Sequence, residues 1–408
     1  MRIALVTPFD PDATMGKYAR LILPSLCKRH NVDVWCPLSS RLIEAQTPVI
    51  PFESSLALGD PRLDAYDLLL YQMGNDANHF PRILELSLQR PGVHILHDFV
   101  LHHLVSNYYL QLLRHPMGYL HEIEKAYGKA VRRYAEETVA GRNNGLWETD
   151  LVSRYPLFEP VLANALGAVV HSNHHLEAVQ AVFDGPSTRI DLAVAPVPPR
   201  TCLTRAALGV PDDRVLMVAS GYINRTKLLH TVIEALHRSP QLSSQALFAV
   251  VGQDCPVEGP RLRAMVRDFH LEDCVRFTGY QTEEYLHGWL QNADICINLR
   301  RPNTEGASCS VIEQMRHGKP VVVIREGFYA ELPDGAVVQA EPDKLDRLHE
   351  LLLRVVSDKA LRERTAAAAR DYSSSRFDAD SYGERLADFL EEVLAARPRI
   401  LLRQRVEA

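Results

Sequence analysis

No stretch of this 408-residue chain approaches the roughly 18 consecutive apolar residues that would span a bilayer. Its 7 cysteines are scattered and form no CxxC pair, which argues against a disulfide framework and against a zinc ribbon. Neither sign of charge dominates, because 45 Lys and Arg residues against 51 Asp and Glu residues leave a net charge of −6. A mildly acidic balance disfavours general nucleic-acid binding, so we expect no nucleic-acid partner.

What is present is an ordinary globular composition, with 46% hydrophobic and 24% charged residues. At about 150 residues per domain, the length suggests two or three domains. The opening residues, MRIALVTPFD, contain too short an apolar stretch for a secretory signal peptide, so the expected location is the cytoplasm. The segment 397–405 mixes basic and apolar side chains. It is expected to be a basic extension, with peripheral contact to the inner face of a membrane as the alternative.

Short apolar strands alternate with amphipathic helices, a pattern typical of parallel sheets covered on both faces. In the first half we expect helices over 17–26 and from about 174, and strands over 3–7, 32–36, 68–71, 93–96 and 168–171. The segment 99–166 breaks the alternation and is predicted to be a helical insert. Its aromatic residues are expected to pack in a core or, alternatively, to form a platform for an acceptor: Tyr108, Tyr109, Tyr119, Tyr127, Tyr134, Trp147 and Tyr155.

The proline-rich stretch Ala195-Pro196-Val197-Pro198-Pro199 can form neither a helix nor a central strand, so it marks a joint between domains. After it we expect strands over 215–220, 246–252, 275–278, 295–299 and 320–324, with helices over 227–238, 259–269, 283–291 and 308–317, and from 344 to about 396. The predicted fold is α/β, with domains over 1–198 and 199–378 and a last helix and tail over 379–408. Open parallel sheets bind ligands beyond the carboxyl ends of their strands.

Two cations lie in the loop that follows the predicted strand 215–220, where the chain turns toward a helix. Arg225 and Lys227 in such a place can hold a phosphate or a diphosphate. The alternative is a solvated loop with two ordinary surface cations, and the loop by itself leaves both interpretations open.

Small residues and two glutamates mark the loop after the predicted strand 295–299. The segment 306–308, Gly-Ala-Ser, lets backbone amides approach a ligand closely, and amides at a helix N-terminus bind anions. Glu305 precedes it, and Glu313 follows Ser308 by about one and a half helical turns. The two carboxylates can therefore accept hydrogen bonds from sugar or ribose hydroxyls. The alternative is a helix capped by Ser308 with Glu313 on its solvated face.

No metal site is expected from the acidic or histidine-rich segments. Asp10-Pro11-Asp12 fits a turn after the first strand, and Asp378-Ala379-Asp380 fits the start of the last helix, where acids are favoured. A zinc site needs three or four converging ligands. We therefore expect capping, surface or cleft-lining roles for the histidines of the first half: His97, His102, His103, His171, His174 and His175.

Together these motifs resemble those of the retaining glycosyltransferases of glycosyltransferase family 4, most strongly over 213–325. The resemblance rests on Asn224, Arg225 and Lys227, on Glu305-Gly306 to Glu313, on His317-Gly318-Lys319-Pro320-Val321-Val322, and more loosely on His97-Asp98 and Val170-His171-Ser172. The family usually has adjacent glycines in its first loop, where this chain has Met15-Gly16. It often has glycine after the lysine, where this chain has Leu228.

The resemblance implies the GT-B fold, in which two Rossmann-like domains face each other across a cleft. The first domain would be the acceptor domain, and the last helix would pack back on it. The second would be the nucleotide-sugar donor domain. The residues implied to bind the donor are Gly16, Lys17, Asn224, Arg225, Lys227, Glu305, Gly306, Ala307, Ser308 and Glu313.

Individual roles follow from the same resemblance. Arg225 and Lys227 would neutralise the donor diphosphate, Glu313 would bind the ribose, and Glu305 would contact the sugar hydroxyls. The amides of 306–308 would meet phosphate or sugar oxygens. His97 would line the reacting centre near the acceptor, which makes His97, Glu305, Arg225 and Lys227 the implied catalytic set.

The implied activity is transfer of a hexose with retention of the anomeric configuration. The donor would be a UDP- or GDP-sugar, which is a substrate, so neither a cofactor nor a metal is expected. The acceptor would be a glycan, a lipid-linked sugar or a small molecule. Two alternatives remain: a nucleotide-sugar epimerase of the same fold, and a non-catalytic glycosyltransferase-like binding subunit.

Overall fold

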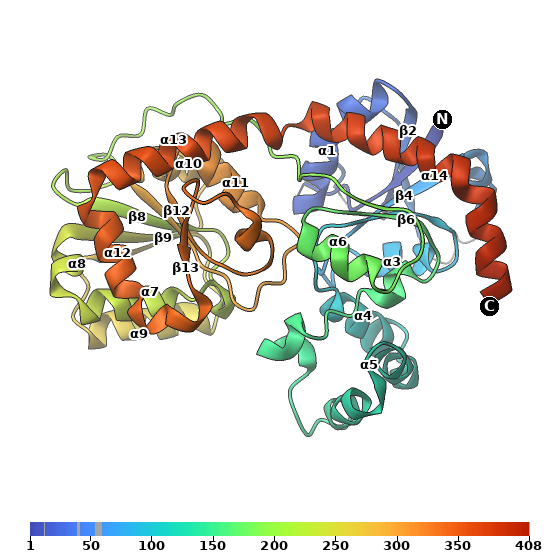
Figure 1. Cartoon of the computed structure of the whole chain (residues 1–408), viewed down its shortest axis with the longest axis horizontal. Helices are drawn as coiled ribbons and strands as arrows, with labels where there is room; N and C mark the ends of the chain where they lie inside the picture. The colour runs from blue at the N-terminus through green and yellow to red at the C-terminus, as the bar shows by residue number, and fades with distance from the viewer. Residues whose placement is uncertain (12, 39–40, 54–58, 408) are drawn as a thin grey trace. The chain divides into compact units, whose positions relative to one another are not determined.

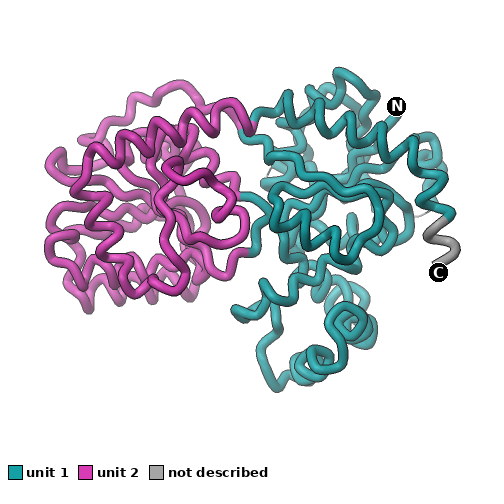
Figure 2. The backbone as a smooth tube through the Cα atoms, in the orientation of Figure 1, with its two compact units in different colours: residues 1–194, 304–307, 378–408 teal, residues 195–303, 308–377 magenta. Residues whose placement is uncertain are grey.

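The structure is a computed structural model that describes residues 1–11, 13–38, 41–53 and 59–407. The chain divides into two compact units, drawn in different colours in Figure 2. Unit 1 comprises Met1–Val194, Thr304–Ala307 and Asp378–Ala408, and unit 2 comprises Ala195–Asn303 and Ser308–Phe377. The short segment Thr304–Ala307 therefore groups with unit 1 although its flanking residues belong to unit 2.

Unit 1 is built on a parallel seven-stranded sheet of order β3-β2-β1-β4-β5-β6-β7. The strands are β1 (Arg2–Val6), β2 (Asn31–Pro37), β3 (Val49–Phe52), β4 (Leu68–Met73), β5 (Gly92–Leu96), β6 (Ala165–Val170) and β7 (Ser187–Arg189). The central strands β4, β5 and β6 are buried along their whole length, because helices cover both faces. The strand order reverses between β1 and β4, which is where open α/β sheets hold ligands.

The first helix and the last helix lie side by side in unit 1 (Figure 1). These are α1 (Thr14–Cys27) and α14 (Ala379–Glu407), and the sheet's remaining helices include α3 (Pro81–Ser87) and α6 (Asn173–Gln180). Lys28 and Arg29, which follow α1, pair with carboxylates of α14: Lys28 with Asp380 at 2.7 Å and Arg29 with Glu391 at 2.6 Å. Arg397 of α14 also donates to the Asp67 carbonyl at 2.7 Å.

The insert between β5 and β6 is helical, as predicted. It contains α4 (His102–Asn107), a π-helical turn (Tyr108–Leu112), α5 (Pro116–Val139) and three 3-10 turns (Leu146–Glu148, Asp150–Ser153 and Glu159–Leu162). Gly128, at φ 79°, interrupts α5. The aromatic side chains pack into the core of unit 1, with Tyr108 and Tyr119 buried and the others partly buried against them. These aromatic residues therefore pack in a core, as the first of the two interpretations expected.

Unit 2 is built on a parallel six-stranded sheet of order β10-β9-β8-β11-β12-β13. The strands are β8 (Val215–Ser220), β9 (Ala246–Val251), β10 (Val275–Gly279), β11 (Ile295–Asn298), β12 (Val321–Ile324) and β13 (Val338–Ala340). The helices are α7 (Leu229–Arg238), α8 (Pro240–Gln245), α9 (Glu258–Asp268), α10 (Glu283–Asn292), α11 (Cys309–Arg316), α12 (Leu348–Ser357) and α13 (Lys359–Arg376). α12 packs on α7 and α8, whereas α13 packs on α11 (Figure 1).

The predicted α/β architecture with two Rossmann-like sheets is confirmed. Every strand expected from the sequence is present within a few residues, but three short strands, β3, β7 and β13, were missed. Their sequences, VIPF, STR and VQA, are short and carry proline or polar residues, as edge strands do.

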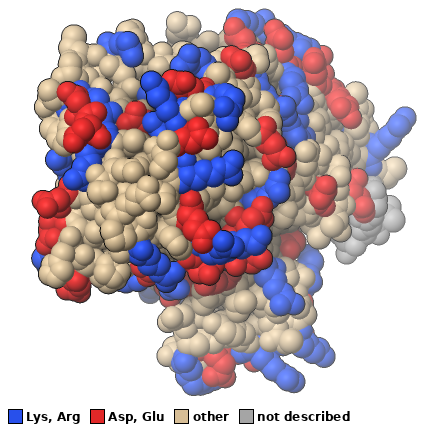
Figure 3. Space-filling view, turned by 60° about the vertical axis from the view of Figure 1, so that its left-hand side comes forward, with Lys and Arg blue, Asp and Glu red and all other residues tan. Residues whose placement is uncertain are grey.

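Charged side chains of both signs are interspersed on the face drawn in Figure 3. Among the described residues, no helix has both the length and the apolar character needed to span a membrane. Side chains beyond 402 in the basic tail lie outside the described residues.

Candidate functional site

The loop 221–227 lies at the carboxyl end of β8, the central strand of unit 2. It passes in direct contact with the loop after β9: a Cβ on Gly252 would lie 2.0 Å from the Gly221 carbonyl oxygen, so only glycine fits there. Gly221 itself has φ 98°, a left-handed value that favours glycine. The amide of Ile223 donates to the Gln253 carbonyl at 2.8 Å. These contacts fix the start of the cationic loop.

The two predicted cations differ in exposure. They occupy a 3-10 turn, η6 (Arg225–Lys227), in which Arg225 is exposed and Lys227 retains 8% exposure. The Nζ of Lys227 donates to the carbonyl of Ser220, the last residue of β8. Asn224 precedes the turn, and its Oδ1 accepts from the Thr226 hydroxyl at 2.8 Å. Lys227 therefore lies against the strand end, whereas Arg225 points its charge to solvent.

Leu228 follows the lysine at the position where the resembled family often has glycine. It adopts φ 48° and ψ 33°, the left-handed helical region, and separates η6 from α7. A Cβ in this region costs about 1–2 kcal/mol. The backbone geometry of the loop is thus one that glycine suits, and this chain holds it with leucine.

A third cation, missed in the sequence, lies beside the same loop. Arg300 follows β11, and its guanidinium donates to the Thr226 hydroxyl at 3.1 Å. The next amide, that of Arg301, donates to the Thr226 carbonyl at 2.9 Å. Its position directly after a buried parallel strand was the signal that could have identified Arg300.

A buried polar network joins the ends of β8 and β11 to the start of α11. The Gln314 amide nitrogen donates to the Ser220 hydroxyl at 3.3 Å, and Asn298 donates to Ser310 at 2.9 Å and to Gln314 at 3.3 Å. Ser308 is 1% exposed, and its hydroxyl lies 3.2 Å from that of Ser310. This network was not expected from the sequence, although polar residues inside apolar elements were the available signal.

Glu313 lies on α11 and is partly buried, with 30% of its side chain exposed. Burial raises the pKa of its carboxyl, and the nearby charge of Glu283 raises it further. Its Oε1 is 3.8 Å from Nδ1 of His287 on α10. Ser308 occupies the N-cap position of α11 but makes no side-chain capping bond. The alternative is confirmed in placing Ser308 at the N-cap, but Glu313 is partly buried and does not lie on a fully solvated face.

In unit 1, His97 follows β5 and forms one end of a hydrogen-bonded pair of imidazoles. Its Nδ1 lies 3.1 Å from Nε2 of His171, whose Nδ1 lies 2.9 Å from the Ile190 carbonyl. A carbonyl only accepts, so His171 carries its proton on Nδ1 and accepts at Nε2. His97 must then donate from Nδ1, which leaves Nε2 as an unprotonated acceptor.

The environment of His97 keeps it neutral. Burial, and secondarily the neighbouring His171, lower its pKa well below the usual value. Among the described residues, its Nε2 is buried without a hydrogen-bond partner. The Tyr18 ring of α1 packs edge-on against the imidazole, with 4.8 Å between centroids. His97 therefore holds a buried, unprotonated Nε2 that can accept a hydrogen bond but cannot donate one.

Glu305 lies in the segment Thr304–Ala307 that pairs with the chain after β5. Glu305 forms an antiparallel bridge with Asp98, and the amide of Gly306 donates to the His97 carbonyl at 3.0 Å. A Cβ on Gly306 would lie 2.7 Å from that carbonyl oxygen, which explains the glycine. The Gly306 amide is thus used within the protein. That bond opposes the predicted contact between this amide and the donor.

The predicted glycine of the first loop lies in the first turn of α1. A Cβ on Gly16 would lie 2.7 Å from the Asp10 carbonyl oxygen, so the loop after β1 packs directly on the helix backbone. Lys17 is exposed on the same helix. The role predicted for Gly16 and Lys17 in donor binding stays a prediction.

The second acidic D-x-D pattern, at the start of α14, has structural contacts. Asp378 accepts the Ser381 amide at 2.8 Å, and Asp380 pairs with Lys28. Asp12 lies outside the described residues. Of the histidines in the first half, His102 bonds the Tyr119 hydroxyl at 2.8 Å. Within the part of the chain that the structure describes, the one grouping with metal-ligand distances is His287, Glu313 and His317, which the sequence analysis missed.

Comparisons with known proteins agree with the architecture. Residues 203–372 match the model of a family described as Glycosyl transferases group 1. Alpha-D-kanosaminyltransferase of Streptomyces kanamyceticus is 23% identical over 184 residues, which cover 45% of this chain and 47% of that protein. The lipopolysaccharide core biosynthesis glycosyltransferase LpsD of Rhizobium meliloti is 28% identical over 206 residues, 50% of this chain and 56% of LpsD. The chain spans about half the length of the curated relatives it matches.

Solved structures match nearly the whole chain. Sucrose-phosphate synthase of Thermosynechococcus elongatus superposes with a TM-score of 0.68 at 18% identity, covering 97% of this chain and all of that one (100%). Anabaena HepE in complex with UDP gives a TM-score of 0.64 at 16% identity, with coverages of 96% and 100%. The predicted GT-B fold is confirmed. The match over residues 203–372 supports the glycosyltransferase prediction for this part of unit 2, and membership of family 4 stays a prediction.

Proposed function

We propose that the protein transfers a hexose from a UDP- or GDP-sugar to a glycan, lipid-linked or small-molecule acceptor, with retention of the anomeric configuration and without a metal or cofactor. The main support is the cationic loop at the carboxyl end of β8. Arg225, Lys227 and Arg300 gather around it, and the buried polar network ties it to α11. The named activities of the matching relatives support the same reaction class.

The cations act on the leaving group in this proposal. Breaking the anomeric C–O bond develops negative charge on the departing diphosphate, and cations already in place stabilise that charge. Arg225 is exposed and able to meet a phosphate, and Lys227 is held at the strand end by Ser220. Glu313 would accept hydrogen bonds from the ribose hydroxyls.

The resemblance assigns two further side chains, Glu305 and His97, to the transferred hexose. Glu305 would accept from sugar hydroxyls, and the unprotonated Nε2 of His97 would accept from one more. With retention by front-face attack, the acceptor oxygen bonds to the anomeric carbon as the C–O bond to the diphosphate breaks. The acceptor proton passes to the leaving phosphate, so no protein nucleophile takes part.

UDP is the favoured nucleotide. HepE, a structural neighbour, has been solved with UDP and with UDP-glucose. LpsD and AmsK of Erwinia amylovora are named for lipopolysaccharide core and amylovoran biosynthesis, which favours a glycan acceptor. A thermal-shift series with UDP-, GDP- and ADP-sugars tests this choice, because a ligand at about 100 times its Kd stabilises the folded state by about 2.7 kcal/mol.

Turnover of the stabilising nucleotide sugar tests the reaction. Arg225→Gln should lower kcat/KM by about 10²–10³, whereas Arg267→Gln, at an exposed cation of α9, should not. Glu305→Ala should also lose activity. Equal activity of the two arginine variants would refute the diphosphate assignment, and full loss of activity with EDTA would refute metal independence. Conversion of the donor without an acceptor, followed by NMR, would instead indicate a nucleotide-sugar epimerase. Nucleotide binding without turnover would indicate a non-catalytic binding subunit.

A further inference from the structure

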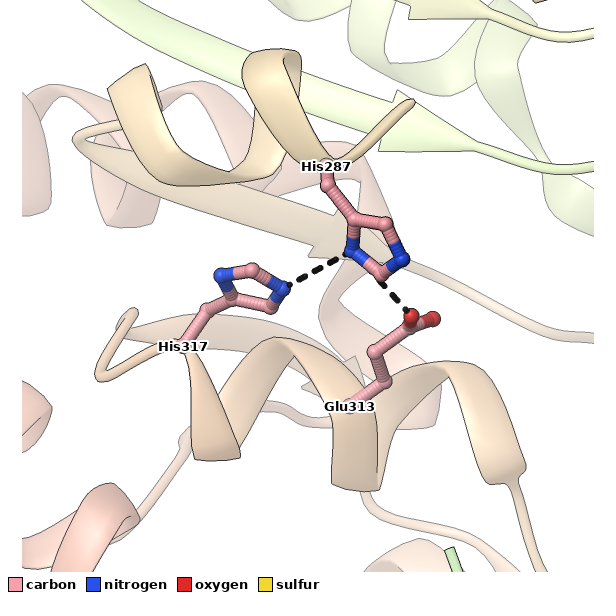
Figure 4. Close-up of side chains that lie close together, drawn as sticks. All are labelled: His287, Glu313 and His317. Atoms are coloured by element: carbon pink, nitrogen blue, oxygen red, sulfur yellow. Dashed lines mark hydrogen bonds and ion pairs between the residues drawn. The ribbon is translucent and has the colours of Figure 1, made fainter. Parts of the chain in front are cut away.

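Three side chains of unit 2 converge between two neighbouring helices (Figure 4). His287 projects from α10, while Glu313 and His317 come from α11 and its C-cap, four residues apart and so on one helix face. Nδ1 of His287 lies 3.3 Å from Nε2 of His317 and 3.8 Å from Oε1 of Glu313. All three potential ligand atoms lie within 4.8 Å of one another.

These distances fit one small metal ion. Two ligands about 2.05 Å from a tetrahedral zinc lie about 3.3 Å apart, which equals the separation of the two imidazole nitrogens. The carboxylate oxygen is 3.8 Å from Nδ1 of His287 and within 4.8 Å of the other nitrogen, so Glu313 would move toward both imidazoles when the ion binds. Two imidazoles and one carboxylate are a ligand set that zinc accepts while keeping a fourth position open. We propose that His287, Glu313 and His317 bind a single zinc ion.

The surroundings allow the ion to enter and to complete its coordination. A cavity of about 310 Å³ in unit 2 is lined by both histidines and by Arg200, Lys319 and Arg370. It supplies a route from solvent and space for a fourth ligand. With Arg316, four cations line the cavity, and they favour an anion as the fourth ligand, because a bound anion offsets their charge and that of the metal.

Lys319 does not occupy the site, because its Nζ donates to the carbonyls of Gln291 and Ala293 at 2.8 and 2.7 Å.

Zinc alone tests the site, with the metal-stripped full chain in equilibrium dialysis. We expect one zinc per chain, and a dissociation constant at least about tenfold higher in His287→Ala and in His317→Ala. The matched control is His121→Ala, an exposed histidine of unit 1. Visible absorption of bound Co²⁺ gives a second readout of the ligand set, and it should be lost in both variants. Sub-stoichiometric zinc binding, or equal affinity in wild type and both variants, would overturn the proposal.

One consequence rests on the proposed function. Glu313 cannot hold a metal and a ribose at once, so zinc should raise the apparent Kd for UDP in wild type but not in His287→Ala. UDP affinity is first measured with EDTA present, where both proteins should bind equally. Failure of metal-stripped protein to bind any nucleotide would count against the proposed function alone. Binding of one zinc per chain without a change in UDP affinity would overturn only the proposed competition between zinc and UDP for Glu313.

Discussion

The left-handed Leu228 makes a quantitative prediction about the cationic loop. At φ 48°, a side chain with a Cβ costs about 1–2 kcal/mol, and replacing it by glycine removes that strain. Against this, glycine has more conformational freedom than alanine in the unfolded chain, which lowers the free energy of unfolding by about 0.5–1 kcal/mol. The difference favours Leu228→Gly over Leu228→Ala by roughly 0.5–1 kcal/mol in the free energy of unfolding.

The comparison with alanine isolates the backbone effect. Leu228 packs partly against the core of unit 2, and both variants lose that packing equally. Ala367, exposed inside α13, is the matched control: there Ala367→Gly should destabilise by about 1 kcal/mol, because glycine is unfavourable inside a helix. The sign of the alanine-to-glycine change is therefore opposite at the two positions.

Hydrogen–deuterium exchange of the β8 and β9 amides in increasing urea measures this free energy for unit 2 itself. That readout is needed because a chain of two compact units does not have to unfold in one step. If Leu228→Gly were less stable than Leu228→Ala, the left-handed geometry, and with it the loop structure used for diphosphate binding, would be refuted.

Two further predictions concern unit 1. Burial lowers the pKa of His171 to about 4. Between pH 6.5 and 4, the unfolded chain therefore binds more protons than the folded chain. As pH falls through this range, the free energy of unfolding should fall by up to about 3 kcal/mol. Urea unfolding against pH should show a shallower fall in His171→Gln, and an unchanged slope would contradict this. Arg29→Ala removes the pairs with Asp388 and Glu391, so the α14 amides should exchange faster, at low salt more than at high salt. Equal exchange at low salt would show that these pairs do not anchor α14.

The architecture could be predicted because central parallel strands are continuous apolar runs, as in AVV of β9 and VVVI of β12. The short edge strands β3, β7 and β13 could not be predicted, because three or four residues with proline or polar side chains are too few to show a hydrophobic periodicity. Motif positions were equally clear, since strand–loop–helix order fixes where 221–227 and 303–308 fall. The contacts of these loops could not be predicted, because the sequence of a loop does not determine which acceptor its backbone amides bond. The Gly306 amide was expected to contact a donor oxygen, but it donates to the His97 carbonyl.

The proton arrangement at His97 shows most clearly what sequence cannot supply. Which imidazole nitrogen is available depends on the Ile190 carbonyl, which fixes the proton on His171 and thereby makes His97 a donor at Nδ1. These residues lie on different segments of unit 1, and their spacing in the chain carries no sign of the contact. In the proposed reaction, a sugar hydroxyl near His97 would meet only an acceptor at Nε2. The burial of His97 opposes a role as a cationic acid.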